Sequence, residues 1–213
     1  MPAPDSRIFF PQLDFPRLQH IFTLRSEDDP EAHSCRESLN SAAFPSDPLI
    51  QAEQPHGSQI ARVGLQDAGK TVPAVDGLIS NEAGITLAIR SADCGPLFLY
   101  DPQHEAVGVV HSGRKGTEAG ILPAAIQAMK ASFQSDPASL IVVLAPCIRP
   151  PHYDSDFAAT LRKQALDSGV LNYHDCGLNT GSDLKRFYSY RMEKGHTGRH
   201  YAAIRLDPDP DKS

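Results

Sequence analysis

The stretch SADCGPLFLYDPQHEAVGVVHSGRKGT, residues 91–117, holds two short apolar runs with a cysteine before the first and a histidine after the second. The runs, residues 96–100 and 106–110, are rich in aliphatic and aromatic residues and are bounded by Asp, Pro, Gln and Gly. This pattern predicts two strands joined by a turn. Cys94 then precedes one predicted strand, and His111 follows the next.

Strands and helices interleave outward from this pair. Aliphatic stretches at residues 140–146 and 201–206 predict strands, and residues 156–169 predict a helix that ends at a glycine cap. Residues 117–133 predict a core-facing helix, although Pro123 falls in its early turns. We therefore expect an α/β or α+β fold with a mixed β-sheet flanked by helices.

The polar segment 26–48 carries helix signals in its middle. Asp28 and Asp29 can cap a helix, Pro30 suits its first turn, and residues 31–44 can continue it. The length of 213 residues favours a single domain over residues 1–213. We expect the tail at 207–213 to be frayed.

Composition excludes several classes of partner. The formal net charge is −6, and no Lys/Arg block is longer than a pair, which argues against nucleic acid as a partner. No apolar run approaches the length of a membrane span, and the first residues lack the pattern of a secretory signal. The four cysteines show no CxxC spacing, so we expect reduced thiols and a cytoplasmic setting.

A second histidine extends the opening pair to three candidate metal ligands. His56 lies between Pro55 and Gly57, which is typical of a turn. A catalytic zinc site takes three protein ligands and keeps a fourth position open, and His56, Cys94 and His111 on loops at strand ends meet that count. Spacing alone leaves the alternatives open, because a buried cysteine often packs as a small apolar residue and a histidine is often a hydrogen-bonded polar residue.

Five phrases of the chain match one protein family in order and spacing. They are QPHGSQI, DGLISNEAGITLAIRSADCGPLFLYDP, VGVVHSGRKGTEAGIL, APCIRPPHYDS and FYSYRMEKGHTGRHYAAI. The chain thereby resembles the family variously called laccase-like polyphenol oxidases, purine nucleoside phosphorylases or peptidoglycan editing factors. The resemblance covers residues 49–206, whereas the part at 1–48 is divergent.

The resemblance implies that His56, Cys94 and His111 bind one zinc ion whose bound water is the reactive group. It implies a purine nucleoside phosphorylase that takes adenosine, inosine or methylthioadenosine together with phosphate, with adenosine deamination as a side activity. One alternative is copper-dependent phenol oxidation, since copper outcompetes zinc on most nitrogen and sulfur sites. Another is a metal-stabilised binding or quality-control protein for cell-wall precursors.

Departures from the family pattern fall beside the expected ligands. Arg114 and Lys115 stand where the family usually has Trp-Arg. A basic turn flanked by glycines can cradle a phosphate, or it can be a solvated pair, and both interpretations remain open. Arg36, in the position of a family arginine, and Arg149 are further candidates for binding the anion or substrate.

Three more residues are candidates to lie next to the expected metal ligands without binding the metal themselves. Asp76 and Asp93 can orient a ligand through a hydrogen bond, as carboxylates next to metal sites commonly do. Cys147 is expected beside the site or in the core. The alternative for both acidic residues is a role in forming turns.

Overall fold

The two apolar runs form an antiparallel pair at the centre of the molecule. Strand β8 (Gly95–Asp101) pairs with β9 (Ala106–Ser112), and all residues of both strands are buried. Because side chains of a strand alternate between its two faces, Phe98 and Val109 enter one core cluster, whereas Leu97 and Val110 enter another. The predicted strand pair is confirmed, and burial on both faces explains why its sequence is continuously apolar.

The computed structural model describes residues 6–26 and 34–210. It contains two six-stranded sheets that each mix parallel and antiparallel pairs, rather than the single mixed sheet expected. The first sheet has the order β1 (Arg7–Ile8), β2 (Leu18–Thr23), β12 (His200–Leu206), β7 (Thr86–Ser91), β3 (Leu49–Ala52) and β5 (Thr71–Val72). The second has the order β11 (Asn172–Asp175), β10 (Ile141–Leu144), β8, β9, β6 (Gly77–Ser80) and β4 (Ile60–Arg62).

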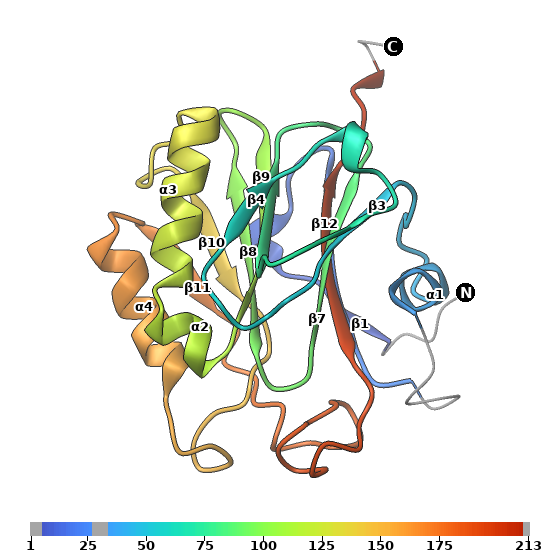
Figure 1. Cartoon of the computed structure of the whole chain (residues 1–213), viewed down its shortest axis with the longest axis vertical. Coiled ribbons are helices and arrows are strands. Elements are labelled where there is room, and N and C mark those ends of the chain that lie inside the picture. Colours follow the sequence, from blue (N-terminus) through green and yellow to red (C-terminus); the bar gives the residue numbers. More distant parts are fainter. Residues whose placement is uncertain (1–5, 27–33, 211–213) are drawn as a thin grey trace.

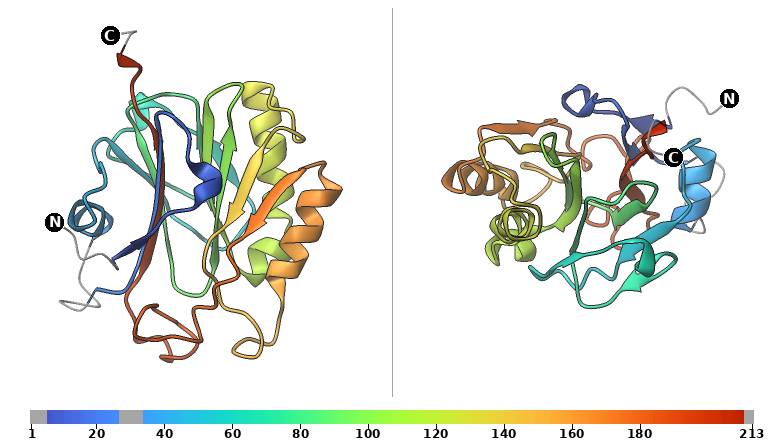
Figure 2. Two further views of the ribbon diagram at one scale, coloured as in Figure 1. Left: turned by 180° about the vertical axis from the view of Figure 1, so that it is seen from behind. Right: turned by 90° about the horizontal axis from the view of Figure 1, so that it is seen from above.

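The sheets face each other, and helices cover their outer faces (Figures 1 and 2). Helices α3 (Ile121–Phe133) and α4 (Phe157–Asp167) pack on the second sheet, where Ile126 and Leu161 join Leu97 in one apolar cluster. Helix α1 (Cys35–Ser41) packs on the first sheet, where Leu39 meets Ala203. Two short 3₁₀ helices cover Pro11–Leu13 and Leu65–Asp67. The expected α+β class in one domain is confirmed.

The helix predicted over residues 117–133 is wrong as one continuous element. Helix α2 (Arg114–Glu118) ends before Gly120, whose φ of 76° lies in the left-handed region, and α3 starts at the next residue. Glycine reaches that conformation without a steric penalty, so it permits the break. Pro123 is the third residue of α3. The backbone N–H groups of the first helical turn make no hydrogen bond within the helix, so a proline, which lacks this group, is tolerated there.

The other sequence-based predictions for elements differ mainly at their ends. Helix α1 begins at Cys35 after a capping box between Ser34 and Glu37, later than predicted, and the expected caps at residues 28–30 lie outside the described residues. Helix α4 is capped by Asp156 as its sequence suggests. The tail was expected to fray from residue 207, but the backbone N–H of Asp207 donates to the Arg17 carbonyl and holds this residue in place. Residues 211–213 of the expected tail lie outside the described residues.

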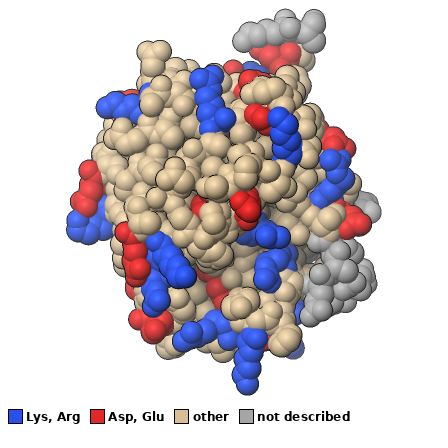
Figure 3. All heavy atoms as spheres, viewed as in Figure 1, with Lys and Arg blue, Asp and Glu red and all other residues tan. Residues whose placement is uncertain are grey.

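The surface shows no continuous basic stripe on the face seen in Figure 3, where Lys and Arg lie among Asp and Glu. Among residues 6–26 and 34–210, no helix combines the length and apolarity needed to cross a bilayer.

Candidate metal centre and adjoining cleft

The fold brings the three predicted ligands together from three loops and strand ends. His56 follows β3, Cys94 lies in the turn between β7 and β8, and His111 is near the end of β9. The antiparallel register pairs Pro96 with His111, so the hairpin returns the histidine beside the cysteine that begins it. One ligand atom from each of the three side chains lies within 4.8 Å of the other two. This group can hold a metal ion.

A buried carboxylate holds both histidines in place. Asp76, which has no exposed surface, lies 3.0 Å from Nδ1 of His111 and accepts from the backbone N–H groups of His56 at 2.9 Å and Gly57 at 2.7 Å. The contact at Nδ1 leaves Nε2 of His111 as the nitrogen available to a metal. The predicted orienting role of Asp76 therefore agrees with its contacts.

Three non-glycine residues at or beside this centre have positive φ. Gln54, His56 and Asp93 have φ values of 68°, 68° and 83°, a region that non-glycine residues occupy at a cost of about 1–3 kcal/mol each. The Gln54 side chain exchanges two hydrogen bonds with the backbone of Arg90 at 2.6 and 2.9 Å. Such contacts offset the strain, and the ligand-bearing turns are held in shape by the protein itself.

The charge state of Cys94 suits metal binding. Burial raises the pKa of its thiol, but hydrogen bonds and charge from His111 and His56 outweigh burial and lower that pKa to about 6. Burial lowers the pKa of His111, whereas Asp76 and Cys94 raise it, to about 9. The two groups therefore favour a thiolate and imidazolium pair at neutral pH, in which Cys94 already has the form that binds metals and His111 would release a proton on binding one.

The glycine after the second ligand strand gives the sulfur its space. A Cβ atom placed on Gly113 would collide with Sγ of Cys94. Gly113 also precedes α2, so the turn that follows His111 passes directly against the thiolate. Any larger residue here would displace either the turn or the sulfur.

A cleft of about 760 Å³ opens beside the three ligands. Among the described residues, its wall includes three aromatic side chains and five cations, with Asp93 as the one carboxylate. The aromatic residues are Tyr153, Phe157 and Tyr190, and the cations are Arg90, Arg114, Arg191, Lys194 and Arg199. The cleft thus combines π-faces with strong positive charge in a chain whose net charge is −6.

Of the four predicted anion-binding residues, only Arg114 lines this cleft. Lys115 is exposed and absent from the lining, although it is the next residue. Arg36 on α1 pairs with Asp47 at the surface. Arg149 does not line the cleft, and Asp175 contacts its guanidinium at 2.9 and 2.5 Å, so its role in anion binding stays a prediction that this ion pair disfavours.

The two remaining predicted residues differ in their access to the cleft, because Asp93 lines it and Cys147 does not. Asp93 does not contact a ligand side chain within the described hydrogen bonds. It accepts from Oγ1 of Thr180 and from the backbone N–H of Arg191, both at 2.7 Å. Cys147 is fully buried, and burial raises the pKa of its thiol. It belongs to the core cluster beneath the site and has no access to the cleft.

Four cations of the cleft were missed as site residues by the sequence analysis. Arg191, Lys194 and Arg199 lie in the irregular segment between residues 187 and 200, and Arg90 lies on β7. The signal for three of them was present in the phrase FYSYRMEKGHTGRHYAAI, which has three Lys or Arg residues within ten positions of Tyr190. No periodicity showed which way these side chains point.

The chain that carries this His/Cys/His group belongs to a defined family. Residues 21–156 and 151–207 match the family model described as multi-copper polyphenol oxidoreductase laccase, so the chain belongs to this family. The resemblance stated from the motifs is thereby confirmed.

Relatives in the family carry a second name. The chain is 30% identical to purine nucleoside phosphorylase YlmD of Geobacillus stearothermophilus, over 76% of this chain and 73% of that protein. It is 31% identical to purine nucleoside phosphorylase YlmD of Bacillus subtilis, over 73% and 69%. The crystal structure of YlmD from Geobacillus stearothermophilus shares the fold with a TM-score of 0.85 at 24% identity, covering 96% of this chain and 100% of that one.

Proposed function

We propose that the chain is a zinc-dependent purine nucleoside phosphorylase of this family, acting on adenosine, inosine or methylthioadenosine. One observation carries the proposal: the His/Cys/His group lies in the wall of a cleft that also has aromatic and cationic side chains. Relatives named purine nucleoside phosphorylase support the substrate class. The free cysteines suit a reducing compartment, and we propose the cytoplasm.

The donor set fits zinc. One thiolate and two imidazoles match the mixed sulfur and nitrogen ligation that Zn²⁺ accepts, and three protein ligands leave a position open. His56, Cys94 and His111 would hold the ion. When bound, zinc would supply Lewis acidity and lower the pKa of a bound water, which would also allow adenosine deamination as a side activity.

The residues of the cleft suit the two halves of a phosphorolysis. Aromatic rings bind a purine by stacking, and Tyr190, which lines the cleft, is more than half exposed as a residue. Cations hold the phosphate, and one phosphate oxygen attacks C1′ of the ribose while the bond from C1′ to the base breaks. The base leaves with the electron pair of that bond and takes up a proton. The chain would contribute orientation and electrostatic stabilisation.

Copper-dependent phenol oxidation is the second candidate, and the family name favours it. The histidine and cysteine ligands bind copper as well as zinc. Within the described part of the chain, however, the cluster of His56, Cys94 and His111 is the one group of three or more metal-binding side chains. We therefore propose that any oxidase activity is weak and depends on replacing zinc by copper.

The proposal is tested by measuring the metal content and the release of free base with and without phosphate. We expect about one zinc per chain and release of base that requires phosphate. Cys94→Ala should lose the metal, whereas Cys176→Ala, which removes another partly buried thiol, should keep it. Release of base at the same rate without phosphate would contradict phosphorolysis, and oxygen uptake by the zinc form would contradict the assignment of the metal.

A further inference from the structure

Four cations of the cleft have no carboxylate partner among the described residues. Arg90, Arg191, Lys194 and Arg199 all line the cleft, and none lies within ion-pair distance of an acidic side chain in the parts of the chain that the structure describes. Arg149, by contrast, is neutralised by a carboxylate. Uncompensated positive charge gathered in a concave site favours an anionic ligand.

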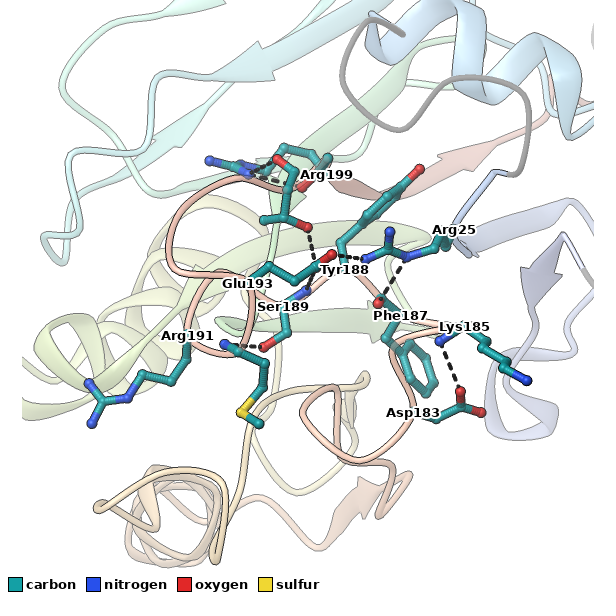
Figure 4. Close-up of polar contacts among 12 residues, drawn as sticks. Arg25, Asp183, Lys185, Phe187, Tyr188, Ser189, Arg191, Glu193 and Arg199 are labelled. Atoms are coloured by element: carbon teal, nitrogen blue, oxygen red, sulfur yellow. Dashed lines mark hydrogen bonds and ion pairs between the residues drawn. The ribbon is translucent and has the colours of Figure 1, made fainter.

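The loop that carries Arg191 and Lys194 and leads to Arg199 is closed by one carboxylate. Glu193 accepts from the backbone N–H of Ser189 at 3.0 Å and from Oγ1 of Thr197 at 2.6 Å, so it joins both ends of the turn. Its other oxygen lies 2.6 Å from Nη2 of Arg25 (Figure 4). Glu193 therefore fixes the shape of residues 189–197, which we call the cation loop.

Arg25 connects the cation loop to the residues that follow strand β2. Its Nε donates to the carbonyl of Phe187 at 3.2 Å, and its guanidinium lies 4.5 Å from the centre of the Tyr188 ring. In Figure 4, Arg191 and Arg199 extend to the same side, away from Arg25. The Arg25–Glu193 pair thus holds the loop from one side and leaves the cations on the other.

A second anchor places the loop beside the metal ligands. Asp93, next to Cys94, accepts from the backbone N–H of Arg191 at 2.7 Å. The guanidinium of Arg191 lies 5.5 Å from the centre of the Tyr153 ring, another residue of the cleft wall. Arg90 faces the loop from β7, where it pairs with Tyr201, two residues after Arg199. All four cations line this one cleft.

We infer that Arg191, Lys194, Arg199 and Arg90 form a subsite for a phosphate group, and that Arg25 and Glu193 are its positioning residues. A phosphate dianion accepts charge-assisted hydrogen bonds from guanidinium and ammonium groups, and four cations more than balance its charge. The phosphate group could be inorganic phosphate, which rests on the proposed phosphorolysis, or the phosphate of a nucleotide. Both sources require the same subsite.

The test titrates zinc-loaded protein by calorimetry, at constant ionic strength, with inorganic phosphate, adenosine 5′-monophosphate and adenosine. We expect Arg191→Gln and Arg199→Gln to weaken binding of the phosphate-bearing ligand about tenfold or more, because each removes a hydrogen bond to a charged group. Adenosine binding should change less than about twofold. Lys70→Gln removes one positive charge from an exposed ion pair away from the cleft and should change neither.

The positioning role has its own readout. Glu193→Ala should weaken phosphate binding severalfold while the zinc content stays at the wild-type level. Glu193→Gln, which keeps an acceptor for the backbone N–H of Ser189, should restore part of the affinity. If Glu193→Ala instead lost its zinc and bound none of the three titrated compounds, the result would indicate general unfolding and would contradict the positioning role.

The outcomes separate this inference from the proposed function. Weaker binding of inorganic phosphate by the arginine variants supports a subsite for free phosphate. Binding of the nucleotide but not of inorganic phosphate supports the subsite and contradicts phosphorolysis. The subsite is contradicted if wild type and both arginine variants bind inorganic phosphate and adenosine 5′-monophosphate with equal affinity. It is also contradicted if the wild type binds neither compound, even if the wild type releases base.

Discussion

Replacing Asp76 by Asn should separate the metal affinity of the centre from the stability of the fold. One carboxylate oxygen, Oδ1, faces the N–H of His56 at 2.9 Å and Nδ1 of His111 at 3.0 Å, and the other, Oδ2, accepts from the N–H of Gly57 at 2.7 Å. An amide of the same shape keeps one acceptor oxygen and turns its NH₂ group toward a donor. At least one of the three hydrogen bonds must therefore be lost.

The size of the effect follows from these contacts. A buried N–H left without an acceptor costs about 1–3 kcal/mol, so the free energy of unfolding of the metal-free protein should fall by that amount. The remaining contact to His111 changes from a carboxylate to a neutral carbonyl, which orients the imidazole less strongly. Loss of such a supporting group typically lowers metal affinity about 10–100-fold. We expect Asp76→Asn to show both effects.

The chain offers a matched control at the other end of β8. Asp101 is also fully buried, accepts from the backbone N–H groups of Gln103 at 2.9 Å and His104 at 3.3 Å, and lies 2.8 Å from Nδ1 of His104. Asp101→Asn should therefore lower stability as Asp76→Asn does but leave metal affinity unchanged. Competition with a chromophoric zinc chelator and urea unfolding measure the two quantities. A folded Asp76→Asn protein with wild-type zinc affinity would refute the orienting role.

Three further perturbations test other parts of the structure. Gly113→Ala should lower zinc affinity in the same chelator assay, because its Cβ would displace the ligand thiolate, and unchanged affinity would count against this packing. Buried His20 and His200 have pKa values lowered, by burial, to about 4 and about 3, so the unfolded chain takes up protons first as pH falls below about 6.5. Urea midpoints should then fall steadily between pH 6.5 and 4, and a flat profile would contradict the neutral state of both histidines. Arg114→Gln should raise the phosphate KM for release of base, whereas Lys115→Gln should change it less than about twofold, and equal effects would place both residues in the cleft.

The strand pair and the ligands could be predicted because they depend on short-range patterns. Two apolar runs separated by turn residues determine an antiparallel hairpin, and the hairpin alone brings Cys94 and His111 together. His56 was a candidate from its turn alone, but only the resemblance to a family favoured it, since its position relative to the other two depends on Asp76 and on two separate sheets. No local pattern contains that information.

The cation loop could not be predicted for the same physical reason. Residues 189–197 have no helix or strand periodicity, so the direction of each side chain depends on the contacts of Glu193 with Arg25, 168 positions away. The sequence analysis therefore favoured Arg149, whose charge is neutralised, over Arg191, whose charge faces the cleft. A basic residue can be recognised in a sequence, but whether a carboxylate already neutralises it is a property of the fold.

The arrangement also explains how a metal centre can be built on strained turns. The apolar clusters between the sheets and under the helices include none of the three ligands, so the core does not depend on the ion. Hydrogen bonds to Asp76 and between Gln54 and Arg90 hold the positive-φ turns. In small zinc domains the ion supplies the folding energy, whereas the apolar clusters and these hydrogen bonds stabilise this fold without contacts to an ion. Contacts among the protein's own residues therefore position the three candidate ligands.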